Sequence, residues 1–323
     1  MKINSTQVLY FTLSAYFNID LFTYLIFFII MSLYLIIVGS NVMLIVVISV
    51  NRSLHEPMYL FLCSLFVNEL YGSSGLFPFL LIQIFSDVHT VSAPLCFLQI
   101  FCIYTYGSVE FTNLAVMSYD RYLAICYPLQ YNILMTSNKV VFLICIIWLS
   151  STLFISVTLS LSASLQLCGN IINKVYCDNH SIIKLACYDT KVNDIYEYVA
   201  GSFTICVPVF VILFTYVQIL KVCFSGSKQT RQKAVSTCTP HLASLLNFSF
   251  GVCFEVLQSR FNMNSVPNMF RIFLSLYFLT CQPLFNPVLY GLNMSKIRQL
   301  CKSLLLSFAG KCGVQHEGKQ IMN

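Results

Sequence analysis

The stretch MSYDRYLAICYPLQY, from Met117 to Tyr131, places an acid and an arginine side by side at the end of a long apolar run. The two charged residues are Asp120 and Arg121. Charged side chains are costly at membrane depth and are rarely kept there without a role. The stretch therefore predicts the end of a membrane-spanning helix that carries a functional charge pair.

The composition of the whole chain is that of an integral membrane protein. Of its 323 residues, 58% are hydrophobic and only 9% are charged, whereas a soluble domain carries about 25% charged residues. The net charge of +6 comes from basic residues scattered beside apolar runs, which fits loops that lie against anionic lipid. Membrane lipid is thus an expected partner, and nucleic acid is not.

Charged residues divide the chain into seven apolar runs, each long enough for a helix that crosses a bilayer. The predicted fold class is an all-α membrane protein, a single seven-helix bundle over residues 1–323. We expect helices at roughly 22–50, 58–85, 93–126, 140–161, 196–221, 233–258 and 269–292. A short amphipathic helix over 294–307 should lie on the cytoplasmic membrane surface, followed by a cytoplasmic tail over 308–323.

The basic residues set the orientation, because Lys and Arg favour cytoplasmic loops. Most of them fall on the side of the carboxyl-terminal end, whereas acids such as Asp178 and Glu197 dilute those on the other side. The amino terminus is therefore expected outside the cell. There Asn4, in the sequon Asn4-Ser5-Thr6, can carry a glycan.

Four of the fifteen cysteines fall on the outer side, where disulfides persist. They are Cys96, Cys168, Cys177 and Cys187. Spacing leaves all three pairings open, and a bridge from Cys96 would fold the long outer loop over the bundle as a lid.

Two other cysteines lie on the cytoplasmic side. The isolated pair Cys238 and His241 is too small a ligand set to predict a metal site. Cys301 is either a palmitoylation site or a plain interfacial cysteine.

Several motifs occur along the chain in an order that matches a known family. They are Pro57-Met58-Tyr59, then Met117-Ser118-Tyr119-Asp120-Arg121-Tyr122 with Ala124-Ile125-Cys126, then Lys233-Ala234-Val235-Ser236-Thr237-Cys238 with His241-Leu242, and finally Pro283 with Asn286-Pro287 and Tyr290. With these motifs the chain resembles an odorant receptor of the rhodopsin-like G protein-coupled receptors, over nearly its whole length. The resemblance implies a plasma-membrane receptor that binds a small odorant in the outer half of the bundle. It also implies activation of a stimulatory, cAMP-raising G protein, with no enzymatic activity and no cofactor beyond a candidate sodium ion.

Some residues depart from the most common pattern of that family. Glu69 stands where most relatives carry Asp, and helix 6 reads Phe248-Ser249-Phe250-Gly251 rather than Phe-Tyr-Gly. Together with the stretch Val67 to Gly72, these residues resemble the class I, fish-type branch.

The resemblance implies a role for specific residues at the cytoplasmic end. Asp120 pairs with Arg121 in the inactive state, and the arginine turns toward a G protein when helix 6 swings outward. The residues matched to this switch are Asp120, Arg121, Tyr122, Tyr216, Asn286, Pro287 and Tyr290. The alternative is an ion pair that only anchors the end of the helix.

Two acids deep in apolar runs, Glu69 and Glu110, each need a partner, a proton or an ion. With Asn41 and Asn286 they resemble the sodium pocket of the family. The alternative is that one acid is protonated and simply hydrogen-bonded. A transporter that uses these acids as a cation path is a competing function, but we find no internal repeat and no broken helices that would support it.

The resemblance also implies the disulfides Cys96–Cys177 and Cys168–Cys187, with Cys96–Cys187 as the alternative. Helical spacing turns one set of residues toward the bundle interior below Cys96, namely Tyr104, Gly107, Ser108 and Phe111. Four further residues match pocket positions of the family, namely Thr204, Phe250, Phe254 and Leu257. Aromatic residues among them are equally consistent with helix packing.

Arg260, at the outer end of helix 6, is the most specific candidate for ligand recognition. A guanidinium binds a carboxylate with two parallel hydrogen bonds, and some class I receptors use an arginine at the matching place. The expected ligand is therefore a small odorant, with an amino acid or another carboxylate as the candidate class. The alternatives are an arginine that reaches to lipid headgroups or one that pairs with Glu255.

Overall fold

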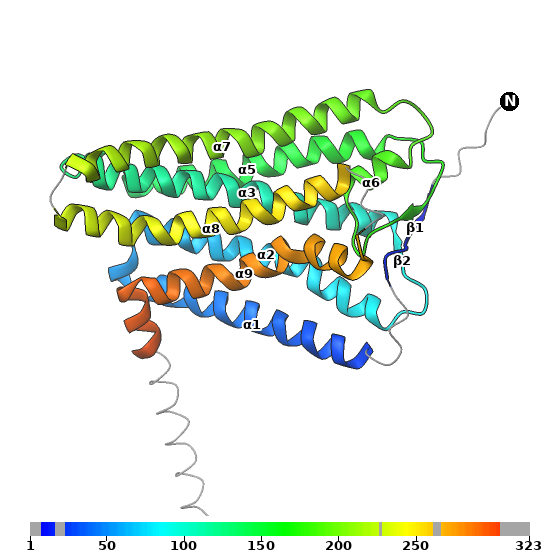
Figure 1. The fold of residues 1–323 in the computed structure, drawn as a ribbon, viewed down its shortest axis with the longest axis horizontal. Helices are drawn as coiled ribbons and strands as arrows, with labels where there is room; N and C mark the ends of the chain where they lie inside the picture. The colour runs from blue at the N-terminus through cyan, green and yellow to red at the C-terminus, as the bar shows by residue number, and fades with distance from the viewer. Residues whose placement is uncertain (1–7, 17–22, 226–227, 261–265, 304–323) are drawn as a thin grey trace, which may run out of the picture.

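The structure is a computed structural model that describes residues 8–16, 23–225, 228–260 and 266–303. Its described part contains seven helices that are long and apolar enough to cross a membrane. They are α1 (Thr23–Val50), α2 (Pro57–Ile84), α3 (Ala93–Cys126), α5 (Ser137–Ala163), α7 (Lys191–Ser225), α8 (Lys228–Arg260) and α9 (Asn268–Asn293). These helices run side by side along the long axis of the molecule (Figure 1). The seven-helix bundle expected from the sequence is thus confirmed.

Short elements gather at the two ends of the bundle. At the cytoplasmic end are η1 (Arg52–Leu54), α4 (Tyr131–Leu134) and a helix over 295–303. At the outer end are β1 (Tyr10–Leu13), β2 (Thr90–Ser92), β3 (Ile171–Ile172) and α6 (Asn179–Lys184). The glycosylation candidate Asn4, the last residues of the expected surface helix and the tail lie outside the described residues.

Three helices extend further than the apolar runs predicted. Helix α5 begins at Ser137 rather than 140, α7 at Lys191 rather than 196, and α8 at Lys228 rather than 233. A charged residue marks where the membrane ends, but main-chain hydrogen bonding continues beyond it, because helix termini can be satisfied in water. At the start of α5 the side chain of Thr136 caps the helix by accepting from the backbone N–H of Lys139.

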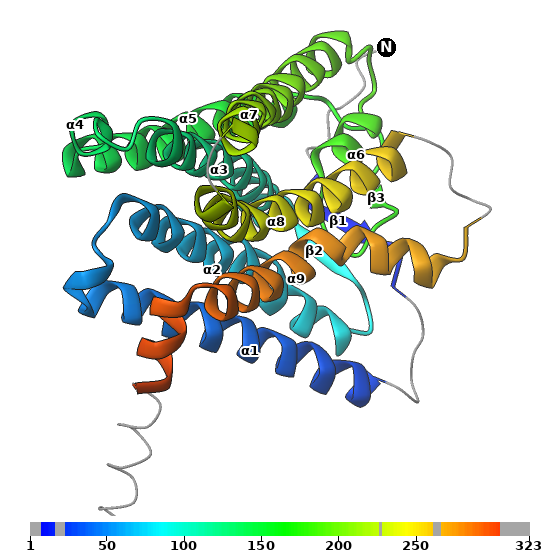
Figure 2. The ribbon, with the colours of Figure 1, turned by 60° about the vertical axis from the view of Figure 1, so that its left-hand side comes forward.

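Helix α3 is the central element of the bundle. It packs against α2, α5, α7 and α8, and it lies between the outer helices α1 and α7 in both ribbon views (Figure 2). Helices α1, α5 and α7 instead expose large apolar side chains, among them Phe28, Phe142 and Phe210. Those side chains face lipid, because a bilayer solvates them as well as the protein interior does.

A lid covers the outer end of the bundle; it consists of residues 164–190 together with β1 and β2. Strand β1 is the middle strand of a small sheet, antiparallel to β2 and parallel to β3. Disulfides join Cys96 to Cys177 and Cys168 to Cys187, which is the pairing implied by the family resemblance. The first fixes the lid to the start of α3, and the second closes the loop on itself.

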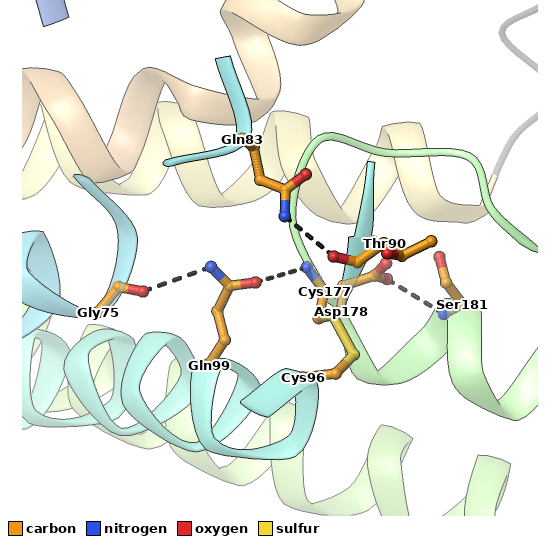
Figure 3. Close-up of a disulfide and its surroundings, with 8 residues drawn as sticks. All are labelled: Gly75, Gln83, Thr90, Cys96, Gln99, Cys177, Asp178 and Ser181. Carbon is orange, nitrogen blue, oxygen red and sulfur yellow. Dashed lines mark hydrogen bonds between the residues drawn. A yellow bond between two sulfur atoms is a disulfide. The ribbon is translucent and has the colours of Figure 1, made fainter. Parts of the chain in front are cut away.

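A buried glutamine reinforces the first disulfide (Figure 3). Gln99 accepts a hydrogen bond from the backbone N–H of Cys177 at 2.9 Å, and its amide group donates to the carbonyl oxygen of Gly75 at 3.4 Å. One side chain therefore links the lid, α3 and α2. Nearby, Gln83 donates to the carbonyl oxygen of Thr90 at 3.1 Å, which attaches β2 to the end of α2.

The packing of α2 on α3 depends on a glycine. A Cβ atom on Gly72 would lie 2.4 Å from the ring of Tyr106, which is fully buried. We expect Gly72→Ala to lower the free energy of unfolding by about 1–3 kcal/mol, because the ring has no room to move away. Thermal unfolding of the purified protein in detergent measures this loss. Gly39→Ala is the matched control, since nothing lies within 4 Å of its added Cβ, and an equal loss in both variants would contradict the prediction.

Candidate functional site

A cavity lies in the outer half of the described bundle, beneath the lid. This outer cavity has a volume of about 400 Å³ and is bounded by α3, α5, α7, α8, α9 and the lid. Six residues proposed for ligand binding lie on its wall, namely Tyr104, Gly107, Ser108, Phe111, Thr204 and Arg260. The helical spacing below Cys96 therefore pointed to the face of α3 that lines this cavity.

The three other proposed ligand-binding residues on α8 do not line the outer cavity. The side chain of Phe250 is 57% exposed on the lipid-facing surface and packs against Tyr277, with ring centroids 5.6 Å apart. Leu257 is also exposed, and Phe254 is absent from the wall. The inward face of α8 is instead formed by Val252, Glu255, Val256 and Ser259. These positions follow a regular i, i+3, i+4, i+7 spacing. The residues that share a helix face with Glu255 could therefore have been identified from the sequence.

Arg260 is held by an acid from another helix. Its guanidinium donates to Glu197 of α7 at 2.7 Å and to the hydroxyl of Tyr198 at 3.1 Å, and it lies 4.3 Å from the centroid of the Tyr198 ring. The acid that pairs with Arg260 is therefore Glu197 and not Glu255, the acid that the sequence offered as the alternative. Arg260 thus joins the outer ends of α7 and α8, and its fork is occupied by a carboxylate of the protein.

Glu255 is paired with the lid instead. The ammonium group of Lys174 contacts Glu255, donates to the hydroxyl of Ser259 at 2.9 Å and lies 3.3 Å from Asp178. Burial acts to lower the pKa of Lys174, but the carboxylates of Asp178 and Glu255 outweigh it and raise that pKa above its usual value. Lys174 is therefore a charged, buried link between the lid and α8.

The acid pair Glu69 and Glu110 lies in the middle of the bundle, and both side chains are fully buried. Asn286 donates to both carboxylates, at 3.0 Å in the case of Glu110. Glu110 also accepts from Asn68 and Gln282, each at 3.0 Å. The donors that surround it are neutral amides, so two acids share one site that lacks a compensating protein charge in these contacts.

The acid pair extends into a larger hydrogen-bonded network. The Tyr106 hydroxyl donates to Glu69 at 3.0 Å, and the Ser244 hydroxyl donates to Asn286 at 2.7 Å. Four members of this network were not anticipated from the sequence, namely Asn68, Tyr106, Ser244 and Gln282. Polar residues with helical spacing along apolar runs were the signal that could have identified them.

Asn41, which the sequence placed with the acid pair, makes different contacts. Its amide group donates to the carbonyl oxygens of Ile37 at 2.9 Å and Pro283 at 3.0 Å. It therefore fixes α1 against the proline bend of α9, and no hydrogen bond joins its side chain to Glu69 or Glu110 among the described contacts.

At the cytoplasmic end, Asp120 contacts Arg121 directly, as the resemblance implied. Asp120 is buried, and its other oxygen accepts from the hydroxyl of Tyr131 in α4 at 2.7 Å. The short helix α4 thus helps to hold the charge pair in place.

Arg121 faces an inner cavity of about 350 Å³, whose wall also includes Tyr290 and His241. The imidazole of His241 donates to the carbonyl oxygen of Leu114 at 2.8 Å and accepts from the hydroxyl of Tyr216 at 2.6 Å. Tyr216 therefore bonds to His241 rather than to Arg121 in this arrangement. Both imidazole nitrogens are occupied, which leaves neither for a metal shared with Cys238.

Three other candidates have plainer surroundings. The Tyr122 hydroxyl lies 3.3 Å from that of Tyr127, on the rim of the bundle. Pro287 lies inside α9, one residue after Asn286. Cys301 is 9% exposed and packs in the hydrophobic core, so its thiol faces the bundle.

Comparison with known proteins places these features in one family. Residues 30–307 match the family model described as olfactory receptor. The human protein olfactory receptor 11A1 is 33% identical over 299 residues, which cover 91% of this chain and 93% of that protein. Human olfactory receptor 10A3 is 31% identical over 92% of this chain and 94% of its own length. Human olfactory receptor 52D1 is 32% identical over 85% and 87%, respectively.

The acid pair yields a prediction about sodium. Glu69→Gln removes one charge while its amide keeps a partner for both Asn286 and Tyr106. If sodium binds between the acids, it should stabilise the parent protein by about 1.4 kcal/mol at a concentration tenfold above its dissociation constant. Glu69→Gln should lose this effect in thermal unfolding measured with sodium against N-methylglucamine. Glu56→Gln, at an exposed acid, is the control. Sodium stabilisation that persists in Glu69→Gln would place the ion elsewhere.

Proposed function

The chain belongs to the olfactory receptor family, and from this premise we propose how its two cavities and the buried network between them produce an odorant response. Membership makes it a multi-pass membrane protein and a G protein-coupled odorant receptor without enzymatic activity.

We assign the odorant to the outer cavity. Its volume suits a small organic molecule, and most of its wall is apolar. The lid closes it from outside through the Cys96–Cys177 disulfide and the Lys174 contacts. The ligand-facing residues in this proposal are Tyr104, Gly107, Ser108, Phe111, Thr204 and Arg260.

The carboxylate ligand expected from Arg260 requires an exchange. Arg260 already binds Glu197 at 2.7 Å, so a ligand carboxylate would have to displace an acid that is part of the fold. An amino acid or other carboxylate therefore remains a candidate only through such an exchange. The proposed function does not depend on it.

The cytoplasmic end carries the output. The observation on which the proposal rests is the contact of Asp120 with Arg121 at the wall of the inner cavity. The arginine of a partly desolvated ion pair has two competing arrangements: it binds its own acid, or it binds a partner protein. Ligand binding can shift the balance between them. We propose that a stimulatory, cAMP-raising G protein inserts at this cavity when α8 moves outward.

The acid pair lies between the two cavities, and we propose that a sodium ion or a shared proton occupies it in the inactive state. Two fully buried carboxylates on one amide, Asn286, cannot both be charged at low cost without a cation. The identity of the neutralising species is what the sodium experiment decides. We also place the chain in the class I, fish-type branch, on Glu69 and the stretch Val67 to Gly72.

The switch is tested by removing its acid. Asp120→Asn weakens the hold on Arg121 and should raise ligand-independent cAMP several-fold in cells that express the receptor, because the inactive state loses a charge-assisted bond. Tyr131→Phe should cause a smaller rise, since it removes only the supporting hydrogen bond of 2.7 Å. Asp87→Asn, at an exposed outer acid, is the control at equal surface expression. Basal cAMP that stays at the parent level in Asp120→Asn would contradict an inhibitory role for the pair.

A further inference from the structure

The charged residues on the wall of the outer cavity are unequal in sign. The described wall carries three carboxylates, Asp178, Glu197 and Glu255, against a single guanidinium, Arg260. Lys174 adds a second cation, which forms ion pairs with two of these acids, Asp178 and Glu255. The sequence alone did not indicate this excess of negative charge, because the acids come from the lid, α7 and α8.

The excess is concentrated around Glu197. In what we name the Glu197 cluster, the ligand-competent atoms of His180, Asp194 and Glu197 all lie within 4.8 Å of one another. Among the described residues, the arginine or lysine that bonds to this cluster is Arg260. The imidazole Nδ1 of His180 lies 3.4 Å from a Glu197 oxygen and has no hydrogen-bond partner, although the residue is only 8% exposed. The cluster therefore holds two carboxylates, of which Glu197 bonds to a guanidinium.

The neighbouring charges do not cancel this excess. Lys174 already serves both Asp178 and Glu255, so that group also has two acids for one cation. Lys184 is exposed and bonds to the backbone oxygen of Ser259 at 2.9 Å. Arg271 lines a separate, smaller cavity rather than this one.

The uncharged part of the wall indicates what kind of molecule would carry a complementary positive charge into the cavity. Apolar and aromatic side chains form the deeper part, among them Ile103, Phe111, Phe154 and Phe278. A negatively charged rim over an apolar floor fits a molecule with a cationic head and a hydrocarbon body. A buried carboxylate in such a setting gains most from a donor that carries a full positive charge.

We propose that the outer cavity binds an organic amine, whose ammonium group docks on Glu197 while its hydrocarbon body fills the apolar floor. This inference rests on the proposed function, since it names the ligand class of the same site. The ammonium group supplies the positive charge that the Glu197 cluster lacks, and it donates to Glu197 beside the hydrogen bonds from Asn179 and Arg260. A carboxylate ligand would add a negative charge to the same wall and compete with Glu197 for Arg260.

The test compares head groups on an unchanged body. Cells that express the full-length receptor are exposed to hexylamine, hexanol and hexanoate, and to phenethylamine, phenethyl alcohol and phenylacetate, with cAMP as the readout. EDTA is present throughout, so that a metal ion at His180 and Asp194 does not contribute. The amines should be more potent than their matched alcohols by about tenfold or more, and the acids should be the weakest.

Variants assign the preference to one carboxylate. Glu197→Gln should weaken the amine response by about tenfold or more and bring it close to that of the alcohol. Arg260→Gln should strengthen the amine response, because a competitor for Glu197 is removed. The double variant Glu197→Gln with Arg260→Gln leaves no unpaired partner behind and should still lose the amine preference. Asp189→Asn, at an exposed acid paired with Lys191, is the control, and surface expression is measured for each.

The opposite outcomes are equally specific. Equal potency of amine and alcohol, or a preference for the acid that Arg260→Gln abolishes, overturns the amine proposal. Activation by zinc alone without EDTA, lost in His180→Gln and Asp194→Asn, reassigns the Glu197 cluster to a metal ion and also overturns it. Silence toward every amine overturns it as well, and the proposed function survives that result if Asp120→Asn still raises basal cAMP in the same cells.

Discussion

An apolar bundle offers no water to a buried charge, and this constraint accounts for most of what distinguishes the protein. Each buried ionisable group must find a partner, because an unpaired one costs several kcal/mol. Glu69 and Glu110 find Asn286, Lys174 finds Asp178 and Glu255, and Asp120 finds Arg121 and Tyr131. The pairings fix the positions of helices that lipid-facing leucines and phenylalanines leave free to slide.

Helix α3 connects these groups into one device. Its outer end is bonded to the lid through Cys96 and Gln99, its middle carries Glu110, and its inner end carries Arg121. A change at the cavity wall therefore has a packed element through which to act, with α8 as the partner that is held at the outer end by Lys174 and Arg260. Those two ion pairs are the contacts that must change if α8 is to move with the lid in place.

Much of this could be predicted from the sequence, for local reasons. The number of spans follows from the lengths of the apolar runs, and the inward face of α3 follows from helical spacing. The face of α8 could not be read in the same way. Its apolar residues lie all around the helix, so the sequence left Phe250 as plausible inward as outward. In the structure its ring is exposed on the lipid side and packs against Tyr277. The same ambiguity affected Asn41, whose partner turned out to be the backbone at Pro283.

The sequence by itself determined the class of protein, the seven spans, their orientation and the charge pair at the end of MSYDRYLAICYPLQY. These depend on composition and on neighbours along the chain. Only the tertiary structure decided which charges meet. Arg260 is five residues from Glu255 and 63 from Glu197, yet it binds Glu197, while Lys174 of the lid takes Glu255. The rotation and offset of packed helices set the distance between two side chains. Because an ion pair strengthens as that distance shortens, the acid that is close in space binds the arginine in place of the one that is close in sequence.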